Sequence, residues 1–327
     1  MAPRLDATAL QTPPETPGGV DAPRLYGRRR RGEQVTMAFL RLTGLVSVLT
    51  TVGIVVVLFR DAAEFFFRTS GITLTRFFTE TQWRPFGSPD SDSFAVGVLP
   101  LLNGTLLVTA IAMVIAIPLG LATAVYLSEY ARPRVRNVLK PALELLAGIP
   151  TVVLGLFALS FMTPALRALV GTEMVAYFNA ASAGIVMGIM IVPTIASLSE
   201  DAMSAVPSAL REGAYGLGAT KRHVVIRIVI PAALSGIVAA VILGLGRAVG
   251  ETMIVAIAAG NLPQMTANPF DQIQTMTAYI VQAVRGEAPR ASITYESIFA
   301  VGAVLFLITF ALNLFAQRFV RRFREVY

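Results

Sequence analysis

Long apolar runs, separated by shorter polar segments, dominate this sequence. A helix needs about 20 mostly apolar residues to cross the hydrocarbon core of a bilayer. Six stretches approach or exceed that length, at residues 42–59, 97–127, 138–161, 181–198, 232–260 and 298–316. The pattern predicts an all-α membrane protein with six transmembrane helices.

The polar segments divide the chain into regions. Residues 1–36 are Pro-rich, lack apolar periodicity and contain four consecutive arginines at 28–31, so we expect a disordered, basic cytoplasmic tail. The first transmembrane helix is expected at 37–60 as an uncleaved anchor, because its apolar part is long and lacks a clear cleavage site. The remaining regions are an outer segment at 61–96, a membrane core at 97–320 with a cytoplasmic loop at 201–231, and a C-terminal cytoplasmic tail at 321–327.

The outer segment at 61–96 is rich in aromatic side chains, with phenylalanines at 65–67 and 77–78 and the single tryptophan, Trp83. Such a composition suits an interfacial helix at the membrane surface. A second outer segment, 261–297, is expected to be a long polar loop. Both segments could receive a soluble extracytoplasmic partner or could simply cap the helices, and the sequence leaves these two interpretations open.

Composition supports a lipid environment and excludes several chemistries. Hydrophobic residues make up 55% of the chain and charged residues 14%, against about a quarter charged in soluble domains. The chain has no cysteine and one histidine, His223, which argues against disulfides, thiol catalysis and a metal site. Most Lys and Arg flank apolar runs, on the side that holds both termini. This distribution of Lys and Arg predicts that both termini are cytoplasmic, and it explains the net charge of +7 without nucleic-acid binding.

The loop at 201–231 has a pattern typical of a helix–turn–helix. Leu210, Ala214 and Leu217 lie at helical spacing. Gly218 then allows the positive φ that a turn requires, and Thr220 can cap a second helix. These features predict a small knob that projects into the cytosol.

This knob resembles the EAA loop of ABC importer permeases, which reads Glu-Ala-Ala, three residues, Gly, nine residues, Ile-x-Leu-Pro. Glu212, Gly218 and Pro231 fall in register, whereas Gly213 replaces the first alanine and Ile230 the leucine. The resemblance implies a type I ABC importer permease fold whose knob docks into an ATP-binding subunit. The residues that it assigns to this coupling are Glu212, Gly213, Ala214, Gly218, Ala219, Thr220, Lys221 and Arg222.

The chain is not expected to hydrolyse ATP. Its only lysines are Lys140, followed by proline, and Lys221, followed by arginine, so no Gly-Lys-Ser/Thr phosphate-binding loop exists. We expect a transport subunit rather than an enzyme, without cofactors, with ATP bound by a partner chain.

The apolar run at 232–260 contains two charged residues. Arg247 lies about midway, where a charge is costly unless it faces the protein interior and has a partner. Glu251 follows four residues later, which on a continuous helix places both on one face. Two interpretations stay open: an anion site built on the guanidinium, which matches a tetrahedral oxyanion, or a fixed ion pair that joins helices.

The segment 246–252, GRAVGET, is similar to the Gly-Arg-Ala-x-Gly-Glu-Thr signature of bacterial phosphate ABC importer permeases. The sequences ELLAGIPT at 144–151 and LGATK at 217–221 also resemble this family, and ELLAGIP with AAGN at 258–261 favours its PstC-type subunit. The resemblance covers about residues 40–320. It implies phosphate uptake with a PstA-type second permease, two ATP-binding subunits and an extracytoplasmic phosphate-binding protein, in the cytoplasmic membrane. The translocation residues expected are Arg247, Glu251, Thr151 and Glu144.

Three rival functions remain open at this point. The cargo could be another oxyanion, such as sulfate or molybdate. The chain could be a membrane enzyme, although it lacks cysteine and paired histidines. A passive anion channel is the third, and it would need no docking knob.

Pro150, beside Thr151, also has two open interpretations. It could expose backbone groups to a substrate, or it could only kink a helix.

Overall fold

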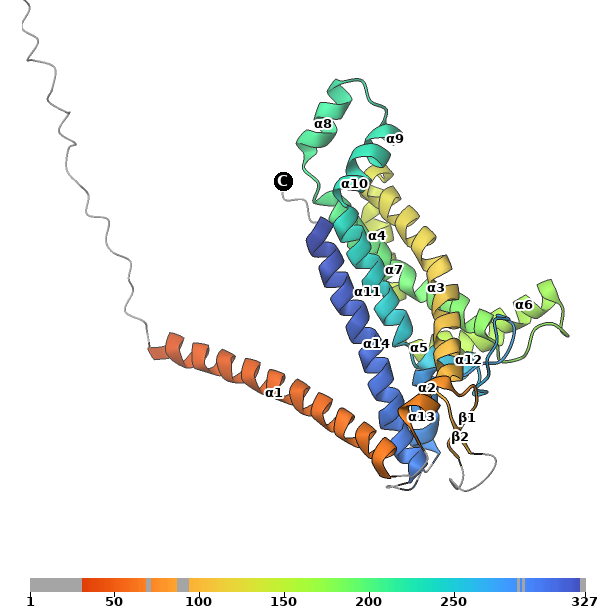
Figure 1. Cartoon of the computed structure of the whole chain (residues 1–327). Coiled ribbons are helices and arrows are strands. Elements are labelled where there is room, and N and C mark those ends of the chain that lie inside the picture. Colours follow the sequence, from red (N-terminus) through yellow and green to blue (C-terminus); the bar gives the residue numbers. More distant parts are fainter. Residues whose placement is uncertain (1–30, 69–71, 87–93, 287–288, 290–291, 324–327) are drawn as a thin grey trace, which may run out of the picture. The chain divides into compact units, whose positions relative to one another are not determined.

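The computed structural model describes residues 31–323 apart from 69–71, 87–93, 287–288 and 290–291 (Figure 1). Most of the tail predicted at 1–36 and the end of that at 321–327 lie outside these residues. The described part is mostly helical. Five of its helices are long and apolar enough to cross a membrane, and a bent pair, Lys221–Ala232 with Leu234–Val249, makes six when counted as one span. The predicted number of six agrees with this upper count.

The chain divides into two compact units, one that ends at Ile54 and one that begins at Val55. Helix α1 (Arg31–Arg68) runs through this division. It contains the candidate span Glu33–Phe67, whose most apolar window has none of its residues buried within the protein. Residues 31–36, expected in the tail, are instead the first turns of this helix.

The second unit contains a helical bundle and a short β-ribbon. Its helices and strands beyond α1 are α2 (Leu74–Thr79), β1 (Trp83–Arg84), β2 (Ala95–Val96), α3 (Leu99–Val125), the π-helical turn η1 (Tyr126–Tyr130), α4 (Pro133–Ala147), α5 (Thr151–Phe157), η2 (Ala158–Met162), α6 (Thr163–Val170), α7 (Ala180–Ser204), α8 (Ser208–Gly216), α9 (Lys221–Val224), η3 (Val225–Val229), α10 (Ile230–Ala232), α11 (Leu234–Val249), α12 (Met253–Ala258), α13 (Met276–Arg285) and α14 (Ile293–Phe323).

Helices α3 and α7 form the centre of the bundle. They approach closely because α7 carries glycine at the contact: a Cβ atom on Gly188 would lie 2.8 Å from the carbonyl oxygen of Ala112. Around this contact the buried core includes Val108, Met187 and Ile191. Small residues at such crossings let two backbones pack closely in a membrane bundle.

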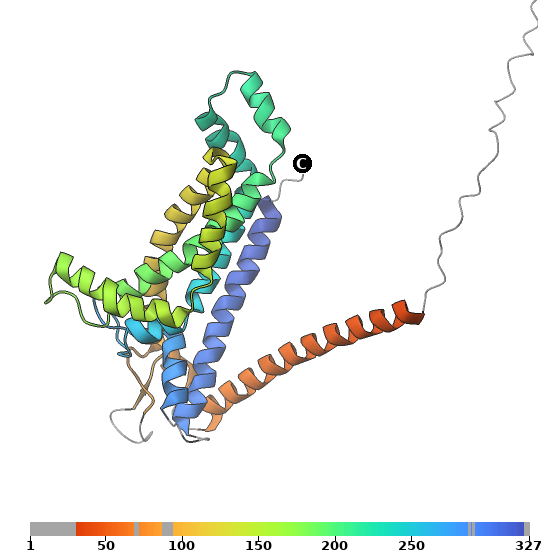
Figure 2. The same cartoon turned by 180° about the vertical axis from the view of Figure 1, so that it is seen from behind.

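The bundle has two distinct ends. Helices α8 and α9 project from the end at which α14 finishes, and α13 with the β-ribbon lies at the opposite end (Figures 1 and 2). Helix α6 points away from the bundle in both views. The predicted knob and the predicted outer segments thus lie at opposite ends of the second unit.

The aromatic segment at 61–96 differs from the interfacial helix that we expected. Phe65, Phe77 and Trp83 are buried inside the protein, where the Trp83 ring meets Tyr279 of α13 edge-on at 5.0 Å. Strand β1 pairs antiparallel with β2, Trp83 opposite Val96. These three rings are core residues, because they pack edge to face with one another and, through Trp83, with α13. Phe67 and Phe78 of the same segment are exposed.

The third predicted span, 138–161, is wrong in its position. The apolar run is divided at Gly148–Pro150, since α4 ends at Ala147 and Pro150 precedes the first residue of α5. The candidate span is Thr151–Val170. Glycine after a helix with proline two residues later is a stop signal, so Pro150 is the N-cap of a new helix instead of kinking an existing one.

Candidate translocation site and coupling knob

The knob has the helix–turn–helix structure that the spacing predicted. Gly218 lies between α8 and α9 with φ +81°, and the Thr220 side chain caps α9 by accepting from the His223 backbone N–H at 3.4 Å. Of the predicted apolar stripe only Ala214 is buried, whereas Leu217 is 91% exposed. Leu217 therefore projects outward from the knob and does not pack beneath it.

The outer surface of the knob is concave and accessible. Seven residues line a hollow of about 520 Å³: Ala214, Leu217, Gly218, Ala219, Thr220, His223 and Ile228. The predicted coupling residues Glu212, Gly213, Lys221 and Arg222 are exposed. A small, exposed hollow beside an apolar side chain is a suitable surface for a protein partner.

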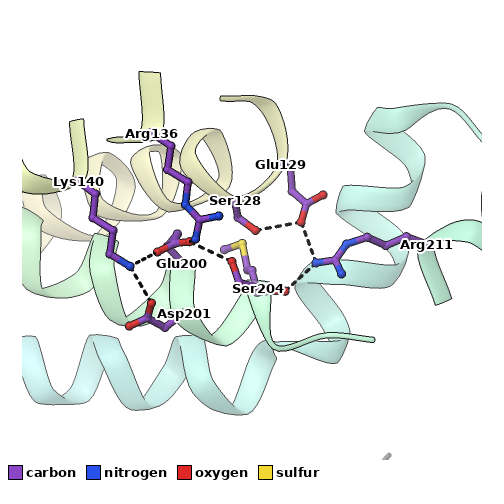
Figure 3. A network of polar contacts seen from close by, with 9 residues as sticks. Ser128, Glu129, Arg136, Lys140, Glu200, Asp201, Ser204 and Arg211 are labelled. Atoms are coloured by element: carbon purple, nitrogen blue, oxygen red, sulfur yellow. Dashed lines mark hydrogen bonds and ion pairs between the residues drawn. The ribbon is translucent and has the colours of Figure 1, made fainter. Parts of the chain in front are cut away.

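Two contacts tie the knob to the end of α3. Arg211 of α8 forms an ion pair with Glu129 of η1, with Nη2 and Oε1 3.0 Å apart, and donates to the carbonyl oxygens of Met203 and Val206 at 2.8 and 2.6 Å. Lys221 of α9 lies 4.8 Å from the centre of the Tyr130 ring. The Arg211 contacts appear at the right of Figure 3. Sequence reasoning missed Arg211 and Glu129, which lie 82 positions apart.

Arg247 lies in the last turn of α11, which ends at Val249. Its Nη1 donates to the hydroxyl of Thr194 on α7 at 3.0 Å, and the side chain is half-buried. The expected position midway along a continuous span at 232–260 is wrong, because the helix breaks at Gly250 and Thr252 before α12 begins. Arg247 thus lies at a helix end beside the middle of α7.

Glu251 has partners other than the predicted one. Its buried carboxylate Oε1 accepts from the backbone N–H groups of Met253 at 3.0 Å and Ile254 at 3.3 Å. Its carbonyl oxygen accepts from the Thr277 hydroxyl at 2.7 Å. Among the ion pairs found for residues that the structure describes, none joins Glu251 to Arg247. The expected contact fails because the spacing of four residues crosses the break after α11.

The other two predicted translocation residues lie on either side of the break at Gly148–Pro150. Thr151 is half-buried as the first residue of α5, a helix that packs against α12. Glu144, on α4, lines a cavity of about 190 Å³ together with Thr194, the acceptor for Arg247. The structure therefore places Glu144 on the same cavity as Thr194, and it brings Thr151 to the helix that Glu251 caps.

The end of α7 nearest the knob carries a charge network that sequence reasoning missed. Glu200 is fully buried and forms ion pairs with Arg136 and Lys140 of α4, and Lys140 also meets Asp201 at 3.0 Å (Figure 3). The hydrogen bond from Lys140 to Glu200, and to a lesser extent the one to Asp201, raises the pKa of Lys140 above its ordinary value. A charged residue directly after an apolar run was the available signal, but its partners come from a distant helix.

Comparison with known proteins identifies the class. Residues 116–325 match the family described as binding-protein-dependent transport system inner membrane component. That match covers more than half of the sequence, and the chain belongs to this family of membrane transport subunits.

Several curated relatives are similar over most of their length. The probable ABC transporter permease protein YqgH of Bacillus subtilis is 36% identical over 75% of this chain and 77% of its own. The phosphate transport system permease protein PstC of Mesorhizobium japonicum is 34% identical, covering 75% and 78%. PstC 1 of Mycobacterium tuberculosis is 36% identical, covering 75% and 81%.

Solved structures agree in fold. A chain of a bacterial ABC transporter that imports alginate aligns with a TM-score of 0.61 at 17% identity, covering 90% of this chain and 97% of that one. A chain of the MetNI methionine ABC transporter aligns with a TM-score of 0.51 at 21% identity, covering 70% and 95%. The predicted fold, that of a type I ABC importer permease, is confirmed.

Proposed function

We propose that this chain is the transmembrane permease subunit of an ATP-driven importer for inorganic phosphate. The family and the PstC relatives supply the class of transporter. The observation that supports phosphate as the cargo is the hydrogen bonding of Arg247. The structure gives it one hydrogen bond, to Thr194, within the part of the chain it describes, whereas a guanidinium has five N–H donors arranged in a planar fork. Its remaining donors suit a tetrahedral oxyanion.

The helix break gives Arg247 a suitable setting. Helix α11 ends two residues beyond Arg247, so backbone and side-chain polar groups lie beside it at the level of the middle of α7. In membrane transporters, interrupted helices of this kind place polar groups at substrate sites near the bilayer midplane. Glu251 then acts by capping α12 and so fixing the break, while Thr194, Glu144 and Thr151 are candidates for neighbouring polar contacts.

The partners follow from the family and from the missing phosphate-binding loop. We propose a second, PstA-type permease, two ATP-binding subunits that receive the knob, and an extracytoplasmic phosphate-binding protein. ATP binds to those subunits, and this chain needs no cofactor. The orientation proposed places both termini and α8–α9 in the cytoplasm and α13 with the β-ribbon outside, in agreement with the distribution of Lys and Arg.

Uptake of radiolabelled phosphate tests this proposal in a strain that lacks other phosphate importers and expresses the complete complex. Arg247→Gln removes the charge and Arg247→Lys keeps it without the fork. We expect Arg247→Gln to abolish uptake and Arg247→Lys to reduce it strongly, while both copurify with the ATP-binding subunits. Excess sulfate or molybdate as competitor should leave wild-type uptake unchanged. Normal uptake by Arg247→Gln, or inhibition by sulfate equal to that by phosphate, contradicts the proposal.

A further inference from the structure

Helix α4 is attached to the bundle in an unusual way. None of its residues is buried in this chain. Its half-buried residues gather on one face: Arg136, Lys140, Leu143, Leu146 and Ala147. Most bundle helices are held by a buried apolar stripe. The inner face of α4 is instead charged in its first half and apolar in its second.

The charged half of this face binds one carboxylate. Glu200 is fully buried and uses both oxygens: Oε1 accepts from Arg136 and from the Ser204 hydroxyl, the latter at 3.0 Å, and Oε2 accepts from Lys140 at 2.8 Å. Figure 3 shows Arg136 and Lys140 reaching Glu200 from the same side. A buried carboxylate without its cations is strongly unfavourable, so the ion pairs of Glu200 hold the charged half of α4 against α7.

Helix α4 is bounded by a break at each end. Before it, Ala131 and Arg132 have extended backbone with ψ of 134° and 150°. After it, the helix ends at Ala147, and Pro150 is the N-cap of α5. Short non-helical joints absorb the backbone rotation when an element moves as a unit. The breaks at both ends therefore allow α4 to turn without bending its neighbours.

The apolar half of the same face forms one wall of the cavity near Arg247. Leu143, Glu144 and Ala147 lie on the α4 side of this cavity, and Pro193, Thr194 and Ser197 lie on the α7 side. Lys140 and Glu200 also line it, so the ion pairs sit at the edge of the cavity. Because Thr194 accepts the hydrogen bond from Arg247, the position of α4 determines access to that contact from one side.

We propose that Glu200 is a positioning residue that latches α4 over this cavity, making α4 a hinged gate on the knob side of Arg247. The inference rests on the proposed function, in which Arg247 meets the anion. One turn further along, α7 and the following residues offer the carbonyl oxygens of Met203 and Val206 to Arg211 of the knob. A movement of the knob therefore pulls on the segment that carries Glu200, which gives the ATP-binding subunits a means to release the gate.

The absence of cysteine from the native chain permits a direct test. Ser197→Cys introduces one thiol into the cavity wall, and labelling of this chain by N-ethylmaleimide is followed in the complete, nucleotide-free complex. Glu200→Gln is isosteric but uncharged, and Arg136→Gln with Lys140→Gln removes the cations from the half-exposed side. Glu173→Gln, an exposed position in the 171–179 loop, is the matched control. Each variant is combined with Ser197→Cys.

The latch variants are Glu200→Gln and the combination of Arg136→Gln with Lys140→Gln. We expect both to increase the labelling rate about tenfold, because the charge-assisted hydrogen bonds that hold α4 are lost. The control should leave the labelling rate unchanged. In transport assays, the latch variants should hydrolyse more ATP per phosphate while half-saturation by phosphate stays within about twofold, because Arg247 is intact. Unchanged labelling in assembled latch variants overturns the gate. Failure of both latch variants to assemble also overturns it, in favour of a purely structural tie.

The outcome for the cargo is separable from the outcome for the gate. If wild-type complex takes up no phosphate but the latch variants still increase labelling, the gate stands and the proposed cargo fails. If uptake depends on Arg247 but labelling does not respond to Glu200, the cargo stands and the gate fails.

Discussion

Arg211 joins the knob to the bundle through its contacts with Glu129, Met203 and Val206, which we call the clasp. The substitution Arg211→Met breaks the clasp while keeping an unbranched side chain. The substitution removes the ion pair to Glu129 and the two hydrogen bonds to Met203 and Val206. Glu129 is only 6% exposed at its side chain, so its carboxylate is left buried without its cation. Removing one partner of a buried pair costs about 3–5 kcal/mol, and the 19% exposure of Arg211 places the cost at the lower end, about 3 kcal/mol.

A loss of about 3 kcal/mol lowers the population of the clasped geometry, relative to an unclasped one, by about a hundredfold. We therefore expect phosphate uptake to fall sharply and ATP hydrolysis per phosphate to rise. The docking hollow formed by Ala214, Gly218 and their neighbours does not include Arg211, so copurification with the ATP-binding subunits should persist. The measurements are uptake and ATP hydrolysis by the same reconstituted complex.

A double-mutant cycle tests the reasoning behind this magnitude. Glu129→Gln and the double variant with Arg211→Met complete the cycle. If the pair carries the coupling, the double variant loses little more than the worse single variant, with an interaction energy of about 1 kcal/mol or more. Losses that simply add, or uptake by Arg211→Met within about twofold of wild type at an unchanged ATP ratio, would refute the clasp.

Two further predictions concern local backbone geometry. Gly218→Val forces a β-branched residue into positive φ, where the backbone of an L-residue is strained by about 1–2 kcal/mol, and should reduce copurification with the ATP-binding subunits. Gly216→Ala, at an exposed helical position with open space around it, is the control. Glu251→Ala removes the acceptor for Met253 and Ile254 and should destabilise the complex by about 1 kcal/mol, seen as a lower midpoint in thermal inactivation. Glu251→Gln keeps an acceptor oxygen and should stay near wild type, and equal destabilisation by both would contradict the cap.

Local signals in the sequence predicted the knob correctly. Gly218 and Thr220 determine the turn and the cap through their own backbone and side chain, so no distant contact is needed to recognise them. The prediction that Leu217 packs with Leu210 and Ala214 was wrong, because helical spacing applies only while the helix continues. Helix α8 ends at Gly216, so Leu217 no longer shares the face of Ala214. What covers an exposed apolar side chain in the assembly is not encoded in the periodicity of this chain.

Helix continuity was the assumption that failed elsewhere. The spacing of Arg247 and Glu251 implies contact only on an unbroken helix, and Gly250 ends α11 between them. The same assumption displaced the third span, although Gly148 and Pro150 together are a recognisable stop signal. Hydropathy measures how apolar a run is, so it locates membrane segments well and their breaks poorly.

Contacts between distant segments could not be predicted at all. Glu200 meets Lys140 across 60 positions, and Trp83 meets Tyr279 at the end of the bundle opposite the knob (Figure 1). Such pairs depend on how α4, α7 and α13 pack, which the periodicity of each helix leaves undetermined. The aromatic segment was assigned to the membrane surface for this reason, since a buried ring and an interfacial ring look alike in sequence.

Reconstituted transport tests the central claim most directly. The complete complex is reconstituted in proteoliposomes that enclose the phosphate-binding protein, and the knob faces the outside medium. The movement of radiolabelled phosphate is followed with and without ATP in that medium. Our account predicts ATP-dependent movement of phosphate that Arg247→Gln abolishes in an assembled complex. Phosphate flux that is independent of ATP, or that is equal in the wild-type and Arg247→Gln complexes, would contradict it.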